Sequence, residues 1–134
     1  MTDQGPAVVD IRRQEPENLM RAYGLDLKLL QPWEGLNAPF RGAWCVLRPG
    51  DVSLPHAHTE HELFIAMAGR ADVVTDGVRH QFAAGDIVFM KAGMEHFVAN
   101  DHDEDFSYYA IWWDRTMADE FIGLEPESAP VESV

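Results

Sequence analysis

Residues 50–69 of the 134-residue chain read GDVSLPHAHTEHELFIAMAG and contain three of its six histidines. His56 and His58 are two residues apart, so on an extended strand both side chains point to the same face. Glu62 keeps this parity if the chain stays extended, whereas His61 has the opposite parity. Imidazole nitrogens together with a carboxylate suit Zn, Fe, Mn, Ni or Co. The spacing therefore predicts a metal site, and the competing interpretation is a set of solvated histidines on an edge strand.

A second segment, residues 85–100, reads GDIVFMKAGMEHFVAN and adds His96. Together the two segments closely resemble the paired motifs of the cupin superfamily, in which the second histidine-bearing hairpin supplies the fourth ligand. Fifteen residues lie between Gly69 and Gly85, which is similar to the short spacing of small microbial single-domain cupins. Lys91 stands where that family usually has proline. The resemblance implies one divalent ion per chain, with Zn preferred over Fe, Mn, Ni or Co, held by His56, His58, Glu62 and His96.

Composition limits the class of protein. Ten Lys and Arg residues stand against 23 Asp and Glu residues, a formal net charge of −13, which argues against DNA or RNA as a ligand. With 46% hydrophobic residues and no apolar run of membrane-spanning length, we expect one cytoplasmic domain with no membrane contact. The single cysteine, Cys45, excludes an internal disulfide or a thiolate zinc cluster.

Short runs rich in Val, Ile, Phe and Trp between Gly and Pro residues are typical of an all-β domain. With the resemblance, they predict a small cupin-type β-barrel, or jelly-roll sandwich, with an N-terminal arm (1–24), a barrel (25–114), and a helical segment and flexible tail (115–134). Short helices are expected at 17–23 and 115–124, and Asp76-Gly77 predicts a tight hairpin turn. The expected strands are Leu25–Leu30, Ala43–Arg48, Glu62–Met67, Arg70–Thr75, Val78–Phe82, Asp86–Met90, His96–Ala99 and Phe106–Trp113.

The last expected strand, FSYYAIWW at 106–113, is apolar on both faces. One face is expected to line a pocket, so that either Tyr108 or Tyr109 orients a substrate. The other apolar face would be unfavourable in contact with water, which predicts that a second subunit of a homodimer or a partner protein covers it. The alternative is that the chain's own N-terminal segment covers this face. Arg41 and Arg48 are candidate anchors for a substrate carboxylate.

Four protein ligands leave coordination positions open on the metal, which favours an enzyme acting on a small molecule, with Glu62 as ligand or base. Three further segments, 61–67, 73–77 and 110–114, resemble the cupin modules of hydrazine-forming synthetases. That resemblance implies an amino-acid-derived substrate, nitrogen-nitrogen bond formation and a methionyl-tRNA-synthetase-like partner. An iron-dependent dioxygenase and a non-catalytic metal-stabilised binding module remain the alternatives.

Overall fold

The computed structural model describes residues 9–36, 38–55, 57, 59–114 and 116. Within them the chain is all-β, as the sequence predicts, with one 3₁₀ turn and nine strands. The bounds are η1 (Pro16–Asn18), β1 (Met20–Ala22), β2 (Leu25–Leu29), β3 (Arg41–Leu47), β4 (His61–Ala68), β5 (Arg70–Thr75), β6 (Val78–Ala83), β7 (Ile87–Met90), β8 (His96–Ala99) and β9 (Phe106–Trp113).

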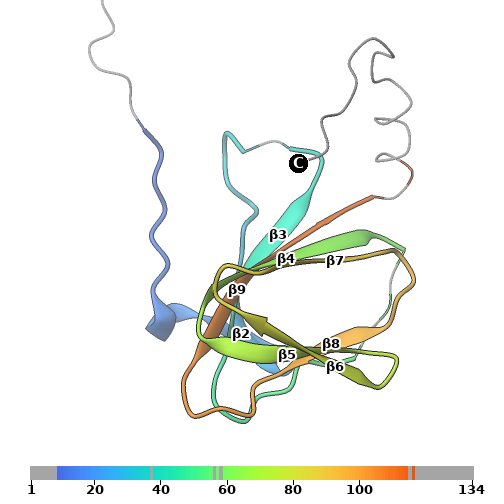
Figure 1. Cartoon of the computed structure of the whole chain (residues 1–134). Coiled ribbons are helices and arrows are strands. Elements are labelled where there is room, and N and C mark those ends of the chain that lie inside the picture. The colour runs from blue at the N-terminus through green and yellow to red at the C-terminus, as the bar shows by residue number, and fades with distance from the viewer. Residues whose placement is uncertain (1–8, 37, 56, 58, 115, 117–134) are drawn as a thin grey trace, which may run out of the picture.

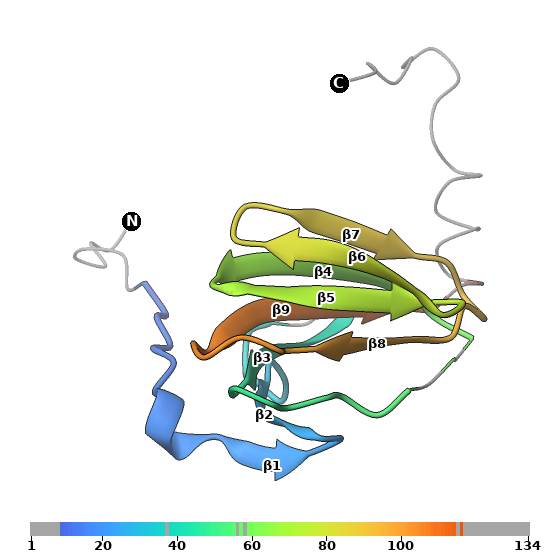
Figure 2. The same ribbon diagram turned by 60° about the horizontal axis from the view of Figure 1, so that its bottom comes forward.

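The strands form two antiparallel sheets that face each other. The larger sheet has the order β1-β2-β3-β9-β4-β7 and the smaller sheet the order β6-β5-β8. In Figure 1, β4 and β7 lie above β5, β6 and β8, and Figure 2 shows the larger sheet continuing to β1. This is the jelly-roll sandwich that the sequence predicts, because the chain crosses from one sheet to the other between β4 and β5 and at each connection from β6 to β9, so that the two sheets enclose one interior.

The interior follows from alternation along the strands. On β9, Phe106, Tyr108 and Ala110 are buried, whereas the residues between them are only partly buried. Phe106 meets Phe82 of the smaller sheet edge to face, with ring centroids 5.6 Å apart. Leu47 and Val98 are fully buried from opposite sheets, so one continuous apolar core joins the two layers.

Two turns lead into strands of the smaller sheet. Asp76 and Gly77 have φ values of 51° and 73°, and Thr75 pairs with Val78, which confirms the predicted tight hairpin between β5 and β6. Between β7 and β8, the Met94 amide donates to the Lys91 carbonyl at 3.2 Å. The chain therefore turns there although Lys91 replaces the proline of the family pattern.

The predicted helix over 17–23 is wrong beyond its first turn. Within residues 16–23 only η1 is helical, and β1 then pairs with β2, with Met20 opposite Leu27. A short helix forms few backbone hydrogen bonds of its own, whereas the edge of β2 offers partners for this segment. The second predicted helix, 115–124, falls outside the described residues apart from residue 116. Within the described part of the chain, no helix is long and apolar enough to cross a membrane.

Candidate functional site

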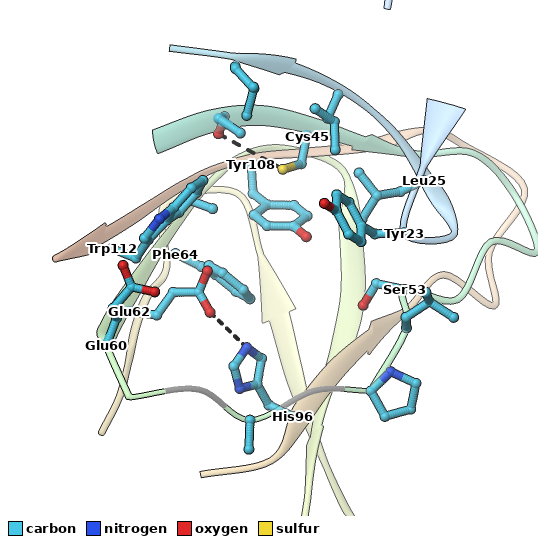
Figure 3. A pocket seen from close by; sticks show the side chains of 17 residues that line it. Tyr23, Leu25, Cys45, Ser53, Glu60, Glu62, Phe64, His96, Tyr108 and Trp112 are labelled. Atoms are coloured by element: carbon cyan, nitrogen blue, oxygen red, sulfur yellow. Dashed lines mark hydrogen bonds and ion pairs between the residues drawn. The ribbon is translucent and has the colours of Figure 1, made fainter. Parts of the chain in front are cut away.

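Two predicted metal ligands from different sheets meet inside the sandwich. Glu62 is the second residue of β4, and His96 is the first residue of β8. Their side chains point toward each other, with Nε2 of His96 2.8 Å from Oε1 of Glu62 (Figure 3). Both residues are buried, with 2% of His96 and 5% of Glu62 exposed. The fold therefore brings together two polar groups that are 34 positions apart in the sequence.

The ring of His96 is oriented by the backbone. Its Nδ1 lies 3.0 Å from the Met94 carbonyl, and since a carbonyl only accepts, Nδ1 carries a proton and donates. Nε2 is then the atom that faces Glu62. Burial lowers the pKa of His96, but the hydrogen bond and charge of Glu62 and the Met94 carbonyl outweigh it, so the pKa is raised. A histidine whose other nitrogen donates to a carbonyl is oriented as metal-binding histidines are.

The other two predicted ligands, His56 and His58, lie outside the described residues. Their neighbours Pro55, Ala57 and Glu60 line the same cavity as Glu62 and His96. Among the residues that can be placed, no group of three or more His, Cys, Asp or Glu side chains is close enough to hold a metal ion. The described pair has the donor chemistry of a metal site, an imidazole nitrogen beside a carboxylate, and so fits two of the four expected ligands.

The pair lies in the wall of a cavity of about 480 Å³. The floor is the inner face of the larger sheet, from β2, β3, β9 and β4, and residues 53–55, 57 and 60 border the other side together with His96 (Figure 3). This volume is within the range of small-molecule sites, about 300 to 1,000 Å³. The sequence predicts the aromatic strand in this wall, and the alternating leucines of β2 are a further apolar face that could have been predicted from spacing.

The structure separates the two candidate tyrosines. Tyr108 is buried, lines the cavity, and packs against Phe64 with ring centroids 4.7 Å apart. Tyr109 is the next residue along β9, so its side chain is on the opposite face, and it does not line this cavity. Burial raises the pKa of Tyr108 well above 10, so its hydroxyl stays protonated and able to donate. Of the two alternatives, the geometry favours Tyr108.

His61, at odd parity, belongs to the outer face of the larger sheet. Its Nδ1 accepts a hydrogen bond from the Ala92 amide at 3.2 Å. The ring lies against Trp113 and Phe89, with centroid distances of 5.9 and 5.7 Å. His61 thus contacts the loop between β7 and β8, and it does not line the cavity that Glu62 lines.

Neither candidate arginine anchor lines the cavity. Arg48 donates to Asp26 and Asp105 at 2.8 Å each, and to the carbonyl of Pro16. Arg41 is exposed, and its guanidinium donates to the Phe40 carbonyl. Arg48 therefore ties the N-terminal strands to the loop before β9, which is a structural role that depends on contacts distant in the sequence.

Similarity to known proteins agrees with this architecture. Residues 43–112 match the family model of the cupin domain. The chain is a cupin. A Cupin 2 conserved barrel domain protein from Salinispora arenicola CNS-205 is 44% identical, with a TM-score of 0.78 over 89% of this chain and 100% of that chain. The plu4264 protein from Photorhabdus luminescens is 39% identical, with a TM-score of 0.77 over 87% of this chain and 97% of that chain.

A more distant similarity is to a cupin-superfamily sugar phosphate isomerase from Silicibacter pomeroyi. It is 26% identical, with a TM-score of 0.61 over 67% of this chain and 59% of that chain. Membership of this superfamily establishes the fold of the chain. The reaction has to be argued from the cavity and its residues.

Proposed function

We propose that this cupin is an enzyme that holds one divalent metal ion on His56, His58, Glu62 and His96 and acts on a small molecule in the adjoining cavity. The observation that carries the proposal is the convergence of Glu62 and His96, 2.8 Å apart and buried, at the wall of a cavity of about 480 Å³. Burying a carboxylate and an imidazole costs free energy, which a bound cation would offset. Zinc is the preferred ion, with Fe, Mn, Ni and Co as alternatives.

The remaining residues suggest how a substrate would be handled. When bound, a divalent ion would supply a Lewis acid that polarises a carbonyl or acidifies a water molecule. Glu62 would serve as ligand, or as base if it is displaced. The protonated hydroxyl of Tyr108 faces the same cavity and would orient a polar substrate atom, while Phe64 and Trp112 would exclude water from the reacting end.

Metal analysis tests the proposal. Protein purified without a histidine tag or added metal should contain about one equivalent of a divalent metal by inductively coupled plasma mass spectrometry. His96→Ala should lose stoichiometric binding, whereas His80→Ala, which removes an exposed histidine of β6, should retain it. Circular dichroism would check that both variants fold. Unchanged stoichiometry and affinity in His96→Ala would refute the ligand assignment.

The resemblance to hydrazine-forming cupins supports a narrower proposal, nitrogen-nitrogen bond formation on an amino-acid-derived metabolite with a methionyl-tRNA-synthetase-like partner. Two of the three similar segments, 61–67 and 110–114, are on β4 and β9, which pair in the sheet and contribute Glu62 and Trp112 to the cavity. Their side chains therefore include part of the surface that a substrate would contact.

An assay with an aminoacyl ester of an N-hydroxylated lysine, in air and without oxygen, tests this narrower proposal. Turnover of zinc-loaded protein in both atmospheres would support it, because zinc has no accessible redox change. Turnover only in air, with iron bound, would favour the dioxygenase alternative. No product from fully metallated protein would refute the nitrogen-nitrogen reaction, although the metal site itself would stand on the metal analysis.

A further inference from the structure

We propose that Tyr23 is a substrate-contacting residue, and that the substrate carries an aromatic or other planar apolar group in addition to the polar group that reaches Glu62 and His96. The inference deepens the proposed function and rests on it, because it names the class of molecule that this cavity would present to the metal ion. It follows from three features of the hairpin turn between β1 and β2: an unfavourable residue type, a fixed backbone and an exposed ring at the cavity.

The turn between β1 and β2 holds a residue that its backbone disfavours. Ala22 pairs with Leu25 across the turn. Tyr23 and Gly24 are its two central residues, and their φ values are 56° and 82°. Two positive φ values are typical of the type I′ turn, which prefers Asn, Asp and Gly because a left-handed backbone is unfavourable for most residues with a Cβ. The hairpin between β5 and β6 also has two positive φ values, and there the first central residue is the preferred Asp76. Hairpin formation alone therefore does not explain a tyrosine at position 23.

Main-chain contacts fix this turn against the segment that leads to the predicted ligands. The Leu54 amide donates a hydrogen bond to the Tyr23 carbonyl at 2.9 Å. A Cβ on Gly24 would collide with the carbonyl oxygen of Val52, so the two backbones pack directly against each other. Neither contact involves the tyrosine side chain. The position of the turn therefore does not require a tyrosine there.

The Tyr23 side chain lines the cavity and is nevertheless exposed. Its ring points from the turn into the cavity (Figure 3). The residue is 67% exposed, whereas Tyr108 in the same wall is 3% exposed. Leu29 and Leu54 also line the cavity and are exposed. Apolar surface that the fold leaves in water contributes little to stability, but a ligand that covered it would gain from its burial.

These positions define the expected class of substrate. Glu62 and His96 are buried, and the ion that they would hold could bind a neutral or an anionic polar group of the substrate. Tyr23 presents an aromatic ring at a part of the same cavity that is open to water. Such a ring packs well on another aromatic or planar group. A molecule that joins a metal-binding group to a planar apolar group would therefore use both parts of the cavity.

Two hydroxamate probes test this contact. Acetohydroxamate and 3-phenylpropanohydroxamate share a metal-binding group, and only the second has an aromatic ring. Isothermal titration calorimetry on the zinc-loaded full chain should show that the wild type binds the phenyl probe about tenfold more tightly or better, because the ring buries apolar area. Tyr23→Asn should lose most of this ratio, and Tyr23→Phe, which keeps the ring, should retain it. An unchanged ratio in Tyr23→Asn would overturn the proposal.

Urea unfolding tests whether the fold itself requires the tyrosine. Tyr23→Asn introduces a residue that tolerates the left-handed backbone, so its urea midpoint should be higher than that of the wild type at matched metal content. Asp76→Asn exchanges two preferred residues in the β5–β6 hairpin and does not touch the cavity wall, so it should leave the midpoint and the probe ratio nearly unchanged. A lower midpoint in Tyr23→Asn would show that the tyrosine stabilises the fold, and this would overturn the proposal.

Metal content, measured on every sample, separates two kinds of failure. A wild type that takes up no metal would refute the proposed function and this inference with it. A metal-loaded wild type for which the phenyl ring adds no affinity would refute this inference alone and leave the metal site in place.

Discussion

Cys45 is a single residue whose environment predicts a pH effect on the whole protein. It is buried on β3, and burial raises the pKa of its thiol from 9.0 to about 12. As pH rises above about 9, the unfolded chain releases this proton before the folded chain does. The stability that this group contributes is therefore complete below pH 9 and is lost as pH rises toward 12.

Urea unfolding at several pH values between 8 and 11 would measure this effect. Cys45→Ala should make the alkaline fall in unfolding free energy less steep than in the wild type, because the replaced side chain does not titrate. Val98→Ala deletes buried apolar atoms without removing a titratable group. It should lower stability by roughly 2 kcal/mol at every pH, since each deleted carbon costs about 0.8 kcal/mol and the cavity adds to this, and it should leave the slope unchanged. Equal slopes in Cys45→Ala and the wild type would contradict the prediction.

At the scale of elements, two glycine turns differ in what surrounds them. Gly77, in the β5–β6 hairpin, has φ of 73° and no atom near the position that a Cβ would take. Gly69, between β4 and β5, has φ of 80°, and a Cβ there would collide with the backbone carbonyl of Asp105. Both positions are strained for alanine, but only Gly69 adds a clash with the main chain.

Alanine substitutions at these two turns should therefore have unequal costs. Gly77→Ala is expected to reduce the free energy of unfolding by about 1 to 2 kcal/mol, the cost of a left-handed backbone for a residue with a Cβ. Gly69→Ala should cost clearly more, since the loop before β9 has to move as well. Chemical denaturation of both variants gives the comparison, and a Gly77→Ala that is as destabilising as Gly69→Ala would show that the clash is relieved without cost.

At the scale of the whole molecule, the outer face of the larger sheet predicts association. Ile87 and Phe89 of β7 are 63% and 50% exposed, and Phe89 stacks on Trp113 of β9 with centroids 6.1 Å apart. Within the described part of the chain, the side chains of Ile87 and Phe89 stay exposed to solvent. The homodimer predicted from the two apolar faces of the strand 106–113 would bury this surface.

Sedimentation velocity at micromolar concentration tests the dimer. The wild type should sediment as a dimer, and Phe89→Asp should shift it toward monomer by placing a charge in the apolar surface. Val78→Asp introduces the same charge at a position that is 54% exposed on β6 of the smaller sheet, and it should not change the assembly. A strictly monomeric wild type would contradict the dimer. If the monomer also failed to bind a synthetase-like protein, the prediction that this face is an interface would be wrong.

The sequence alone determined the periodic features of this protein. Short apolar runs between Gly and Pro residues predicted eight strands close to those observed, and the Asp76-Gly77 pair predicted its hairpin, because both signals depend on neighbouring residues. The paired motifs predicted a cupin and singled out Glu62 and His96. Alternation also indicated that the side chains of Tyr108 and Tyr109 point to opposite faces of the sheet. It left open which of the two tyrosines lines the interior.

Only the tertiary structure decided which features share a space. Glu62 and His96 meet across the sandwich, and Tyr108 lines the cavity. Arg48 forms ion pairs with Asp26 and Asp105 and does not line the cavity. Part of the segment predicted to be an N-terminal helix is instead strand β1, which pairs with the edge of β2. Each of these outcomes depends on contacts between residues far apart in the chain, where local spacing and propensity carry no information, and packing and backbone hydrogen bonding decide.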